Sequence, residues 1–128
     1  MEIKDRAEKH KAQSIHYWGN ALHFIDAGDA EKASEFLWGS VTQALKAVAA
    51  SNDIQLKSHN LLRSYAIALT KQLKDESIKD VFDLAQSLHS NFYETGLLME
   101  DVAMAAEKVK VVVDKLLRLI SEEDRVEK

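Results

Sequence analysis

The chain has 128 residues, of which 46% are apolar and 30% are charged, so it has the size of one domain and enough apolar residues to fill a core. It contains no cysteine and has a formal net charge of −4, which excludes disulfides and thiol catalysis and disfavours a general nucleic-acid coat. It also contains no proline and only 4 glycines, a scarcity that favours long helices.

Hydrophobic spacing predicts five helices. The first covers about residues 4–27, with a predicted inward face of Ile15, Trp18, Leu22 and Ile25. Gly28 is expected to end this helix in the left-handed conformation, and Asp29 to cap the next one.

The second helix is predicted over residues 30–51, with an apolar stripe of Ala33, Leu37, Val41, Ala44, Leu45 and Val48. Ser58 is the expected N-cap of a third helix over residues 59–74. The residues of that helix predicted to face inward are Leu62, Tyr65, Leu69 and Leu73.

The fourth helix is expected to begin at Ser77, which forms a weak capping box with Asp80, and to end near Gly96. Its apolar stripe consists of Ile78, Val81, Phe82, Ala85, Leu88 and Phe92.

The fifth helix, over about residues 100–121, has the widest apolar stripe, which comprises Val102, Ala105, Ala106, Val109, Val112, Val113, Leu116 and Ile120. Residues 122–128 are nearly all charged, so we predict one domain over residues 1–121 followed by a flexible tail. Together these elements predict an all-α fold, an antiparallel up-and-down bundle of four to five helices. The short connections make the first two helices antiparallel neighbours, and likewise the third and fourth.

No run of the sequence approaches the roughly 20 apolar residues that span a bilayer, so no membrane contact is expected. The segment Met1 to Arg6 is polar and lacks the apolar core of a signal peptide. The absence of cysteine fits a reducing compartment, and we therefore expect a cytoplasmic protein.

Two Trp-Gly pairs lie in the middle of the first two helices, at Trp18-Gly19 and Trp38-Gly39. A hairpin centred on Gly28 places the two tryptophans at the same level. A glycine inside a helix costs about 0.5–1 kcal/mol relative to alanine. We therefore expect close helix packing here, and a pocket wall or a dimer surface is the alternative.

His59 and His89 lie on or beside the apolar stripes of their helices. A hairpin centred near Glu76 places His59 near Phe92 and Tyr93, so both histidines are expected at the same end of the bundle. The start of the third helix also offers free N–H groups and a positive dipole end, which suit an anion.

Other polar side chains are expected at this end, from three helices: Lys46, Ser58, Asn60, Arg63, Asn91, Tyr93 and Glu94. We predict a polar pocket for a phosphate or nucleotide, and the ligand-binding residues we select are His59, Arg63, His89, Asn91, Tyr93 and Glu94. The alternative is that the two histidines are structural and fix the helix ends.

The remaining histidines indicate no metal site. His16, Asn20 and His23 share one side of the first helix, but no nearby carboxylate completes a set of ligands, so an ordinary polar surface is expected. His10 lies in a strongly charged turn and is predicted to be solvated.

Sequence signatures of catalysis are missing. The chain has no GxxxxGK[ST] or GxGxxG loop, no HExxH motif and no GxSxG motif. We therefore predict no catalytic residue and no cofactor.

Three segments together resemble the archaeal PaREP-type family of paralogous repeats, which belongs with the HEPN-like helical bundles. The segments are LWGSV followed by ALKA at 37–47, Ser58-His59 with Leu61-Leu62, and LHSNFYE at 88–94. The resemblance covers about residues 30–113, and the LHxNFYE element is its most specific part.

This resemblance implies a homodimeric bundle of four or five helices that binds nucleotides or acts as the partner of a nucleotidyltransferase. Some HEPN-like domains are toxin ribonucleases with four to six residues between an Arg and a His. Here the nearest approach, Arg6 with His10, has only three residues between.

We therefore expect a non-catalytic interaction module, or a module that binds an anionic ligand such as a nucleotide or RNA. The alternative is a divergent metal-independent ribonuclease of toxin–antitoxin type. In that enzyme, imidazoles would serve as general acid and base, and the acting residues would be His59, His89, Arg63 and Tyr93.

Overall fold

The computed structural model describes the backbone of residues 2–95 and 98–126, and the side chains of residues 2–90 and 98–120. It contains five α-helices, which are α1 (Ile3–Asp26), α2 (Ala30–Ser51), α3 (His59–Leu73), α4 (Glu76–Thr95) and α5 (Met99–Val126). The described residues form no strand, so the predicted all-α class is confirmed.

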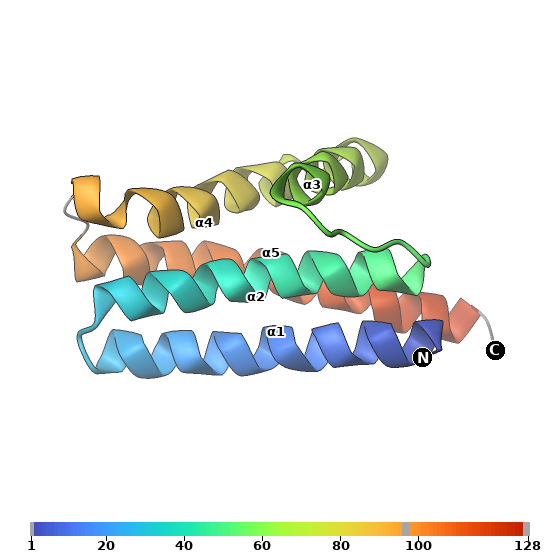
Figure 1. Ribbon diagram of the computed structural model, residues 1–128, viewed down its shortest axis with the longest axis horizontal. Coiled ribbons are helices and arrows are strands. Elements are labelled where there is room, and N and C mark those ends of the chain that lie inside the picture. The colour runs from blue at the N-terminus through green and yellow to red at the C-terminus, as the bar shows by residue number, and fades with distance from the viewer. Residues whose placement is uncertain (1, 96–97, 127–128) are drawn as a thin grey trace.

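Four of the helices form an antiparallel bundle along the long axis of the molecule (Figure 1). Along that axis the chain reverses direction from α1 to α2, and the directions of α4 and α5 alternate in the same way. α1 and α4 each contact both α2 and α5, and α2 and α5 contact each other. α3 lies across this bundle and contacts only α2 and α4 among the described residues.

The core forms around α2, which contacts all four other helices. Every residue of the predicted stripes of α2 and α5 is buried, and so are the described stripe residues of α4. Ala47, Ala49 and Ala50 of α2 are buried as well, because this helix is covered on nearly all sides. None of the helices, as far as they are described, is long and apolar enough to cross a membrane.

The inward face predicted for α1 is correct for Trp18 and Ile25, which are partly buried against the core, and wrong for the other two residues. Ile15 and Leu22 are 53% and 43% exposed, and the buried residues are Ala7, Ser14 and Ala21. These small residues recur every seven positions and bring the backbones of α1 and α2 close together. The hydroxyl of Ser14 donates to the carbonyl oxygen of Ser40 at 2.8 Å, and the hydroxyl of Ser40 donates to the carbonyl oxygen of Ser14 at 3.0 Å.

The predicted caps between α1, α2 and α3 are confirmed. Gly28 has a φ of +77°, and it donates to Ile25 while the N–H of Asp29 donates to Phe24, which closes the left-handed end of α1. The carboxylate of Asp29 accepts from the Lys32 N–H at 3.0 Å. The hydroxyl of Ser58 likewise accepts from the Leu61 N–H at 3.1 Å.

The cap predicted for α4, Ser77, lies two positions after the observed one, Asp75. α4 begins at Glu76, and Asp75 accepts both the N–H and the hydroxyl hydrogen of Ser77. Lys115 of α5 also donates to Asp75 at 3.0 Å. The hydrogen bond from the Ser77 hydroxyl, together with that from Lys115, holds the pKa of Asp75 below its ordinary value.

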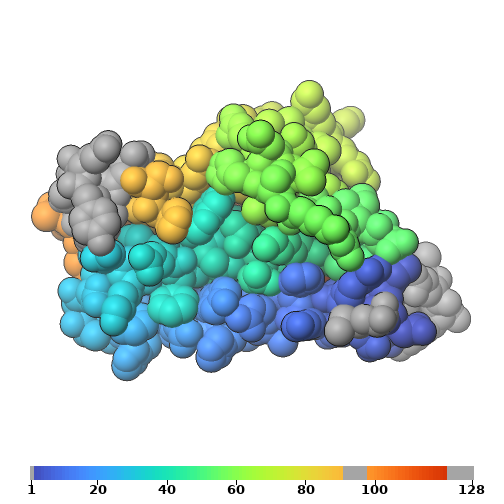
Figure 2. All heavy atoms as spheres, in the orientation of Figure 1, coloured from blue at the N-terminus to red at the C-terminus, as the bar shows by residue number. Residues whose placement is uncertain are grey.

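The path of the connection 52–58 determines where α3 begins. This segment turns back from the end of α2 and runs along it, so that α3 starts beside the middle of α2 (Figure 1). Leu56 is buried in the core and anchors the segment. In the space-filling view, α3 stands above the layer of α1 and α2, and the surface steps down from α3 onto α2 (Figure 2).

Candidate functional site

The half-buried indole of Trp38 is the centre of an aromatic cluster formed by α2, α3 and α4. Its ring centroid lies 5.2 Å from that of Phe82, which packs edge-on. The imidazole of His59 is tilted against it at 5.8 Å, and that of His89 is stacked on it at 5.9 Å. The two histidines therefore contact the same indole.

His59 and His89 both pack against Trp38 on the flank of the bundle instead of at one of its ends. His59 is the first residue of α3, which lies against the middle of α2 (Figure 1). In α4 the ring of His59 contacts that of Phe82, with centroids 6.0 Å apart. Phe82 lies roughly three helical turns before Phe92, the residue that we predicted to lie near His59. The register differs because α3 crosses the bundle. Both histidines remain exposed to solvent.

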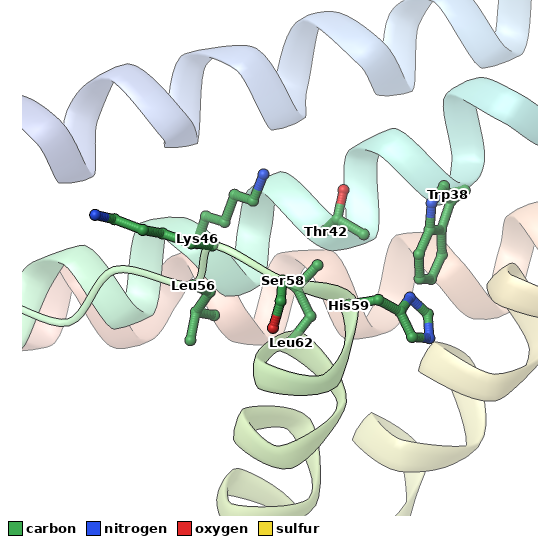
Figure 3. A pocket seen from close by; sticks show the side chains of 8 residues that line it. Trp38, Thr42, Lys46, Leu56, Ser58, His59 and Leu62 are labelled. Atoms are coloured by element: carbon green, nitrogen blue, oxygen red, sulfur yellow. The ribbon is translucent and has the colours of Figure 1, made fainter.

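A cavity of about 270 Å³ opens beside Trp38 (Figure 3). It is bounded by α2, by the end of the connection 52–58 and by the first turn of α3. Its lining residues are Trp38, Thr42, Lys46, Leu56, Lys57, Ser58, His59 and Leu62. Trp38, Thr42 and Lys46 are spaced four residues apart, so they lie on one face of α2.

The polar side of this cavity is basic. Lys46 and Lys57 line it, and the structure shows no ion pair for either lysine among the described residues. The first N–H groups of α3 have no partner within the helix, and the Ser58 hydroxyl satisfies only that of Leu61. This arrangement of ammonium groups and free N–H donors suits an anion.

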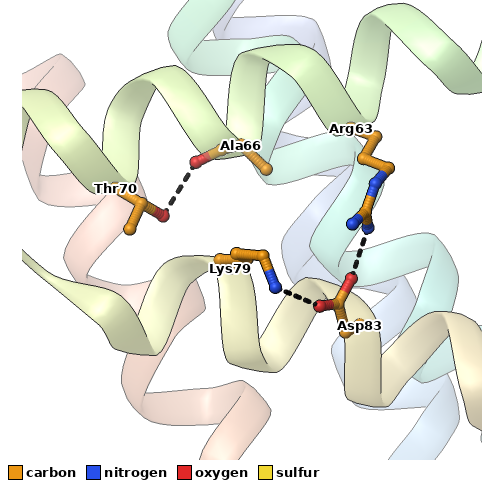
Figure 4. A network of polar contacts seen from close by, with 5 residues as sticks. All are labelled: Arg63, Ala66, Thr70, Lys79 and Asp83. Carbon is orange, nitrogen blue, oxygen red and sulfur yellow. Dashed lines mark hydrogen bonds and ion pairs between the residues drawn. The ribbon is translucent and has the colours of Figure 1, made fainter.

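Arg63 lies on a different surface from the cavity. Its Nη1 donates to Asp83 of α4 at 2.7 Å, and Lys79 donates to the same carboxylate at 2.8 Å (Figure 4). The hydrogen bond from Lys79 and the one from Arg63 hold the pKa of Asp83 below its ordinary value. The guanidinium of Arg63 thus joins α3 to α4.

The other predicted site residues follow His89 at the end of α4. The side chains of Asn91, Tyr93 and Glu94 lie outside the described residues, and their place in the site stays a prediction. Asn60 is exposed on the first turn of α3 and does not line the cavity.

The histidines of α1 have different surroundings. His16 and His23 are exposed, as expected for a polar surface. His10 was predicted to be solvated, but it is half-buried and hydrogen-bonded to Gln43 of α2 at 2.7 Å, because α1 lies close to α2 at this point. The described residues contain no group of three acidic or histidine side chains that would hold a metal ion.

The two Trp-Gly pairs have different roles. The predicted register of the hairpin, with Trp18 level with Trp38, agrees with the close approach of Tyr17 to Gly39. A Cβ on Gly39 would lie 2.9 Å from Cδ2 of Tyr17, so this glycine allows a close approach of α1 to α2. A Cβ on Gly19 would meet no atom within 4 Å. Trp38 lies in the cluster described above, whereas Trp18 faces α5.

Sequence reasoning missed Thr42, Leu56 and Lys57 as lining residues of the cavity. The spacing of Trp38, Thr42 and Lys46 was the available signal, since it puts an aromatic ring, a hydroxyl and an ammonium on one helix face. No sequence pattern showed that the connection 52–58 turns back onto this face.

Comparison with known proteins identifies a family. The model of the archaeal PaREP1/PaREP8 family matches residues 9–113, a span that includes every lining residue of the cavity. No curated protein and no solved structure matches the chain.

Proposed function

We propose that this chain, which belongs to the archaeal PaREP1/PaREP8 family, is a non-catalytic module that binds a nucleotide in the cavity between Trp38, Lys46 and His59. The observation that supports this most is the meeting of an aromatic cluster with two unpaired lysines in one solvent-open cavity. Binding sites of this kind combine apolar walls with a few polar groups that fix the orientation of the ligand.

The aromatic side of the cavity suits a nucleobase. Base stacking on an aromatic side chain contributes about 1–3 kcal/mol per base and depends little on which base it is. Trp38 is held by Phe82 and His89, so its ring does not need to be ordered when the ligand arrives. His59 borders the cavity next to the indole and offers a second flat ring.

The basic side of the cavity suits a phosphate. Lys46 and Lys57 supply two ammonium groups, and the start of α3 supplies backbone N–H donors. The chain as a whole carries a net charge of −4, so the pair of lysines at this cavity is a local basic feature of an acidic chain. A ligand with one base and one phosphate group therefore matches both sides of the cavity.

Titration calorimetry with AMP tests this function. We expect Lys46→Ala and Lys57→Ala each to weaken binding about tenfold, since each removes one charge-assisted contact. The matched control is Lys108→Ala, on the exposed face of α5, which should bind AMP as the wild type does. Equal affinity of all four proteins for AMP, or no heat of binding at all, would contradict the proposal.

The ribonuclease alternative requires His59, His89, Arg63 and Tyr93 to surround one phosphodiester. Arg63 is engaged with Asp83 instead, which favours the non-catalytic function. Incubation of a single-stranded RNA with the wild type and with His89→Ala separates the two functions. Cleavage by the wild type that is lost in His89→Ala would establish the enzyme.

We also propose that the chain forms a homodimer through a groove between α1 and α5. This groove has a volume of about 390 Å³, and its lining residues are Trp18, Leu22, Ile25, Ala103, Ala106, Glu107 and Lys110. Its walls are almost wholly apolar, and the exposed side chain of Ile15 lies on the same stripe of α1. Apolar surface exposed in this way is typical of an interface.

The charges at the rim of the groove support a second copy of the chain as the occupant. Glu107 has no ion pair within the described part of the chain, and Lys110, one turn further along α5, pairs with Asp114 of the same helix at 2.8 Å. In the proposed dimer, a two-fold axis across the groove brings Glu107 of one copy close to Lys110 of the other, as a self-complementary interface requires.

Sedimentation analysis tests the dimer. We expect a dimer for the wild type and a monomer for Leu22→Glu, which puts a carboxylate into the groove. Leu61→Glu alters an exposed leucine of α3 and should leave the dimer intact. A monomeric wild type would overturn this part of the proposal.

The HEPN-like description and the nucleotidyltransferase partner remain predictions that rest on the sequence resemblance alone.

A further inference from the structure

A second cavity adjoins the one beside Trp38. Its volume is about 400 Å³, and its lining residues are Arg6, His10, Lys46, Ala50, Ile54, Gln55, Leu56 and Lys57. Lys46, Leu56 and Lys57 line both cavities. The two cavities therefore lie next to each other along α2 with a pair of lysines at their junction, and we call them together the trough.

The far part of this trough is lined by Arg6 of α1. The Nη2 of Arg6 pairs with Asp53, whereas its Nε is buried and has no hydrogen-bond partner among the described residues. Buried donors in proteins are nearly always satisfied, and each exception calls for an explanation. The guanidinium group of Arg6 thus gives this end of the cavity a polar wall.

The charge of the trough remains positive after the ion pair of Arg6 is counted. Asp53 neutralises Arg6 but does not line either cavity, and its side chain points largely into solvent. Lys46 and Lys57 thus contribute two unopposed charges at the junction. If a phosphate binds at the junction, the two cavities leave space for further parts of the ligand on both sides of it.

The second cavity is larger than a phosphate alone would fill, and its lining mixes apolar with polar side chains. Ala50, Ile54 and Leu56 supply apolar walls, and Gln55 and His10 supply polar edges. A second nucleoside combines a flat ring with a hydroxylated sugar, and this chemistry matches such walls. The volume of about 400 Å³ exceeds that of the cavity beside Trp38.

We propose that the trough binds two successive nucleotides of a phosphodiester-linked ligand, with one nucleoside beside Trp38, the linking phosphate between Lys46 and Lys57, and the second nucleoside near Arg6 and His10. This inference rests on the proposed function, because it assigns a nucleotide to the cavity beside Trp38. It goes further in naming a dinucleotide unit as the ligand and in adding a second subsite.

Calorimetric titration with AMP and with the dinucleotide pApA tests the proposal. The wild type is expected to bind pApA about tenfold more tightly than AMP, since the second subsite adds charge-assisted and apolar contacts. Gln55→Glu places a negative charge in the second cavity only, at an exposed position that preserves the shape of the side chain. This variant should bind pApA no more tightly than AMP and keep its affinity for AMP.

The matched control is Gln72→Glu, which makes the same change of charge on exposed α3 and should retain the preference for pApA. Arg6→Gln serves as a second variant in the cavity and should also reduce the preference. A wild type that binds AMP and pApA equally would overturn the second subsite and leave the proposed function standing. A wild type that binds neither ligand would overturn both.

Discussion

The imidazole of His89 lies nearly parallel to the indole of Trp38, with ring centroids 5.9 Å apart and 16° between the ring planes. This stack connects α4 to α2 next to the cavity. An imidazole ring that lies against an indole in this way quenches the emission of the indole.

The stack predicts that His89 quenches the fluorescence of Trp38. In a protein with Trp18→Phe and His59→Ala, Trp38 is the remaining tryptophan and His89 the remaining imidazole among its described ring partners. Adding His89→Ala removes the stacked ring and should raise the emission of Trp38. An unchanged emission would contradict the stack.

The approach of Tyr17 to Gly39 predicts opposite effects for two equivalent substitutions. Gly39→Ala places a methyl group 2.9 Å from the Tyr17 ring and should lower the free energy of unfolding by about 1–3 kcal/mol. Gly19→Ala meets no atom and should raise it by about 0.5–1 kcal/mol, through better helix propensity. Urea unfolding of both variants measures the difference, and equal shifts would refute the close approach.

The reciprocal hydrogen bonds of Ser14 and Ser40 predict that removing a serine hydroxyl destabilises the protein more when its hydrogen bond joins two helices than when it stays within one helix. Ser14→Ala removes an interhelical bond from a fully buried position and should destabilise the protein by about 1 kcal/mol. Ser34 is also buried, but its hydroxyl donates to Ala30 of its own helix. Ser34→Ala should therefore be nearly neutral in the same unfolding experiment. A larger loss for Ser34→Ala than for Ser14→Ala would count against this packing of α1 on α2.

The ion pairs of Asp83 predict an acid-sensitive contribution to stability. Because its pKa is lowered in the folded chain, the pairs stabilise the protein above the ordinary value of 3.8, and this effect disappears as the pH falls through the lowered pKa. The side chain is 38% exposed, so Asp83→Asn should cost no more than about 1 kcal/mol at pH 7. The difference from the wild type should vanish in strong acid.

Thermal unfolding between pH 7 and pH 2 measures this dependence. Asp80→Asn is the control, since Asp80 lies exposed on the same helix and has no ion pair within the described part of the chain. A difference between Asp83→Asn and the wild type that grows on acidification would contradict the assignment.

The parts of the fold that depend on neighbouring residues were predictable from the sequence. Gly28 and Asp29 act within one turn of the chain, and their conformation follows from local sterics and hydrogen bonding. The predicted apolar stripes of α2 and α5 were also correct, because their apolar side chains gather on one face of each helix and that face has to be buried. In α1, periodicity selected Leu22 over Ala21, although the seam of small residues packs more closely.

The candidate site was predictable only in part, because it depends on the path of a connection. His59 was selected from its place beside the apolar stripe of its helix, and the structure puts it next to the cavity. The crossing of α3 depends on the burial of Leu56 against distant helices, which no local pattern encodes. This crossing moves His59 to the flank of the bundle, next to Lys46.

Side-chain NMR of the two tryptophans and of His59 during titration with AMP shows directly whether a nucleotide binds beside Trp38. We expect the indole N–H signal of Trp38 and the imidazole signals of His59 to shift with added nucleotide, while the indole signal of Trp18 stays in place. Unchanged Trp38 and His59 signals at millimolar AMP, or an equal shift of Trp18, would contradict a nucleotide site in this cavity.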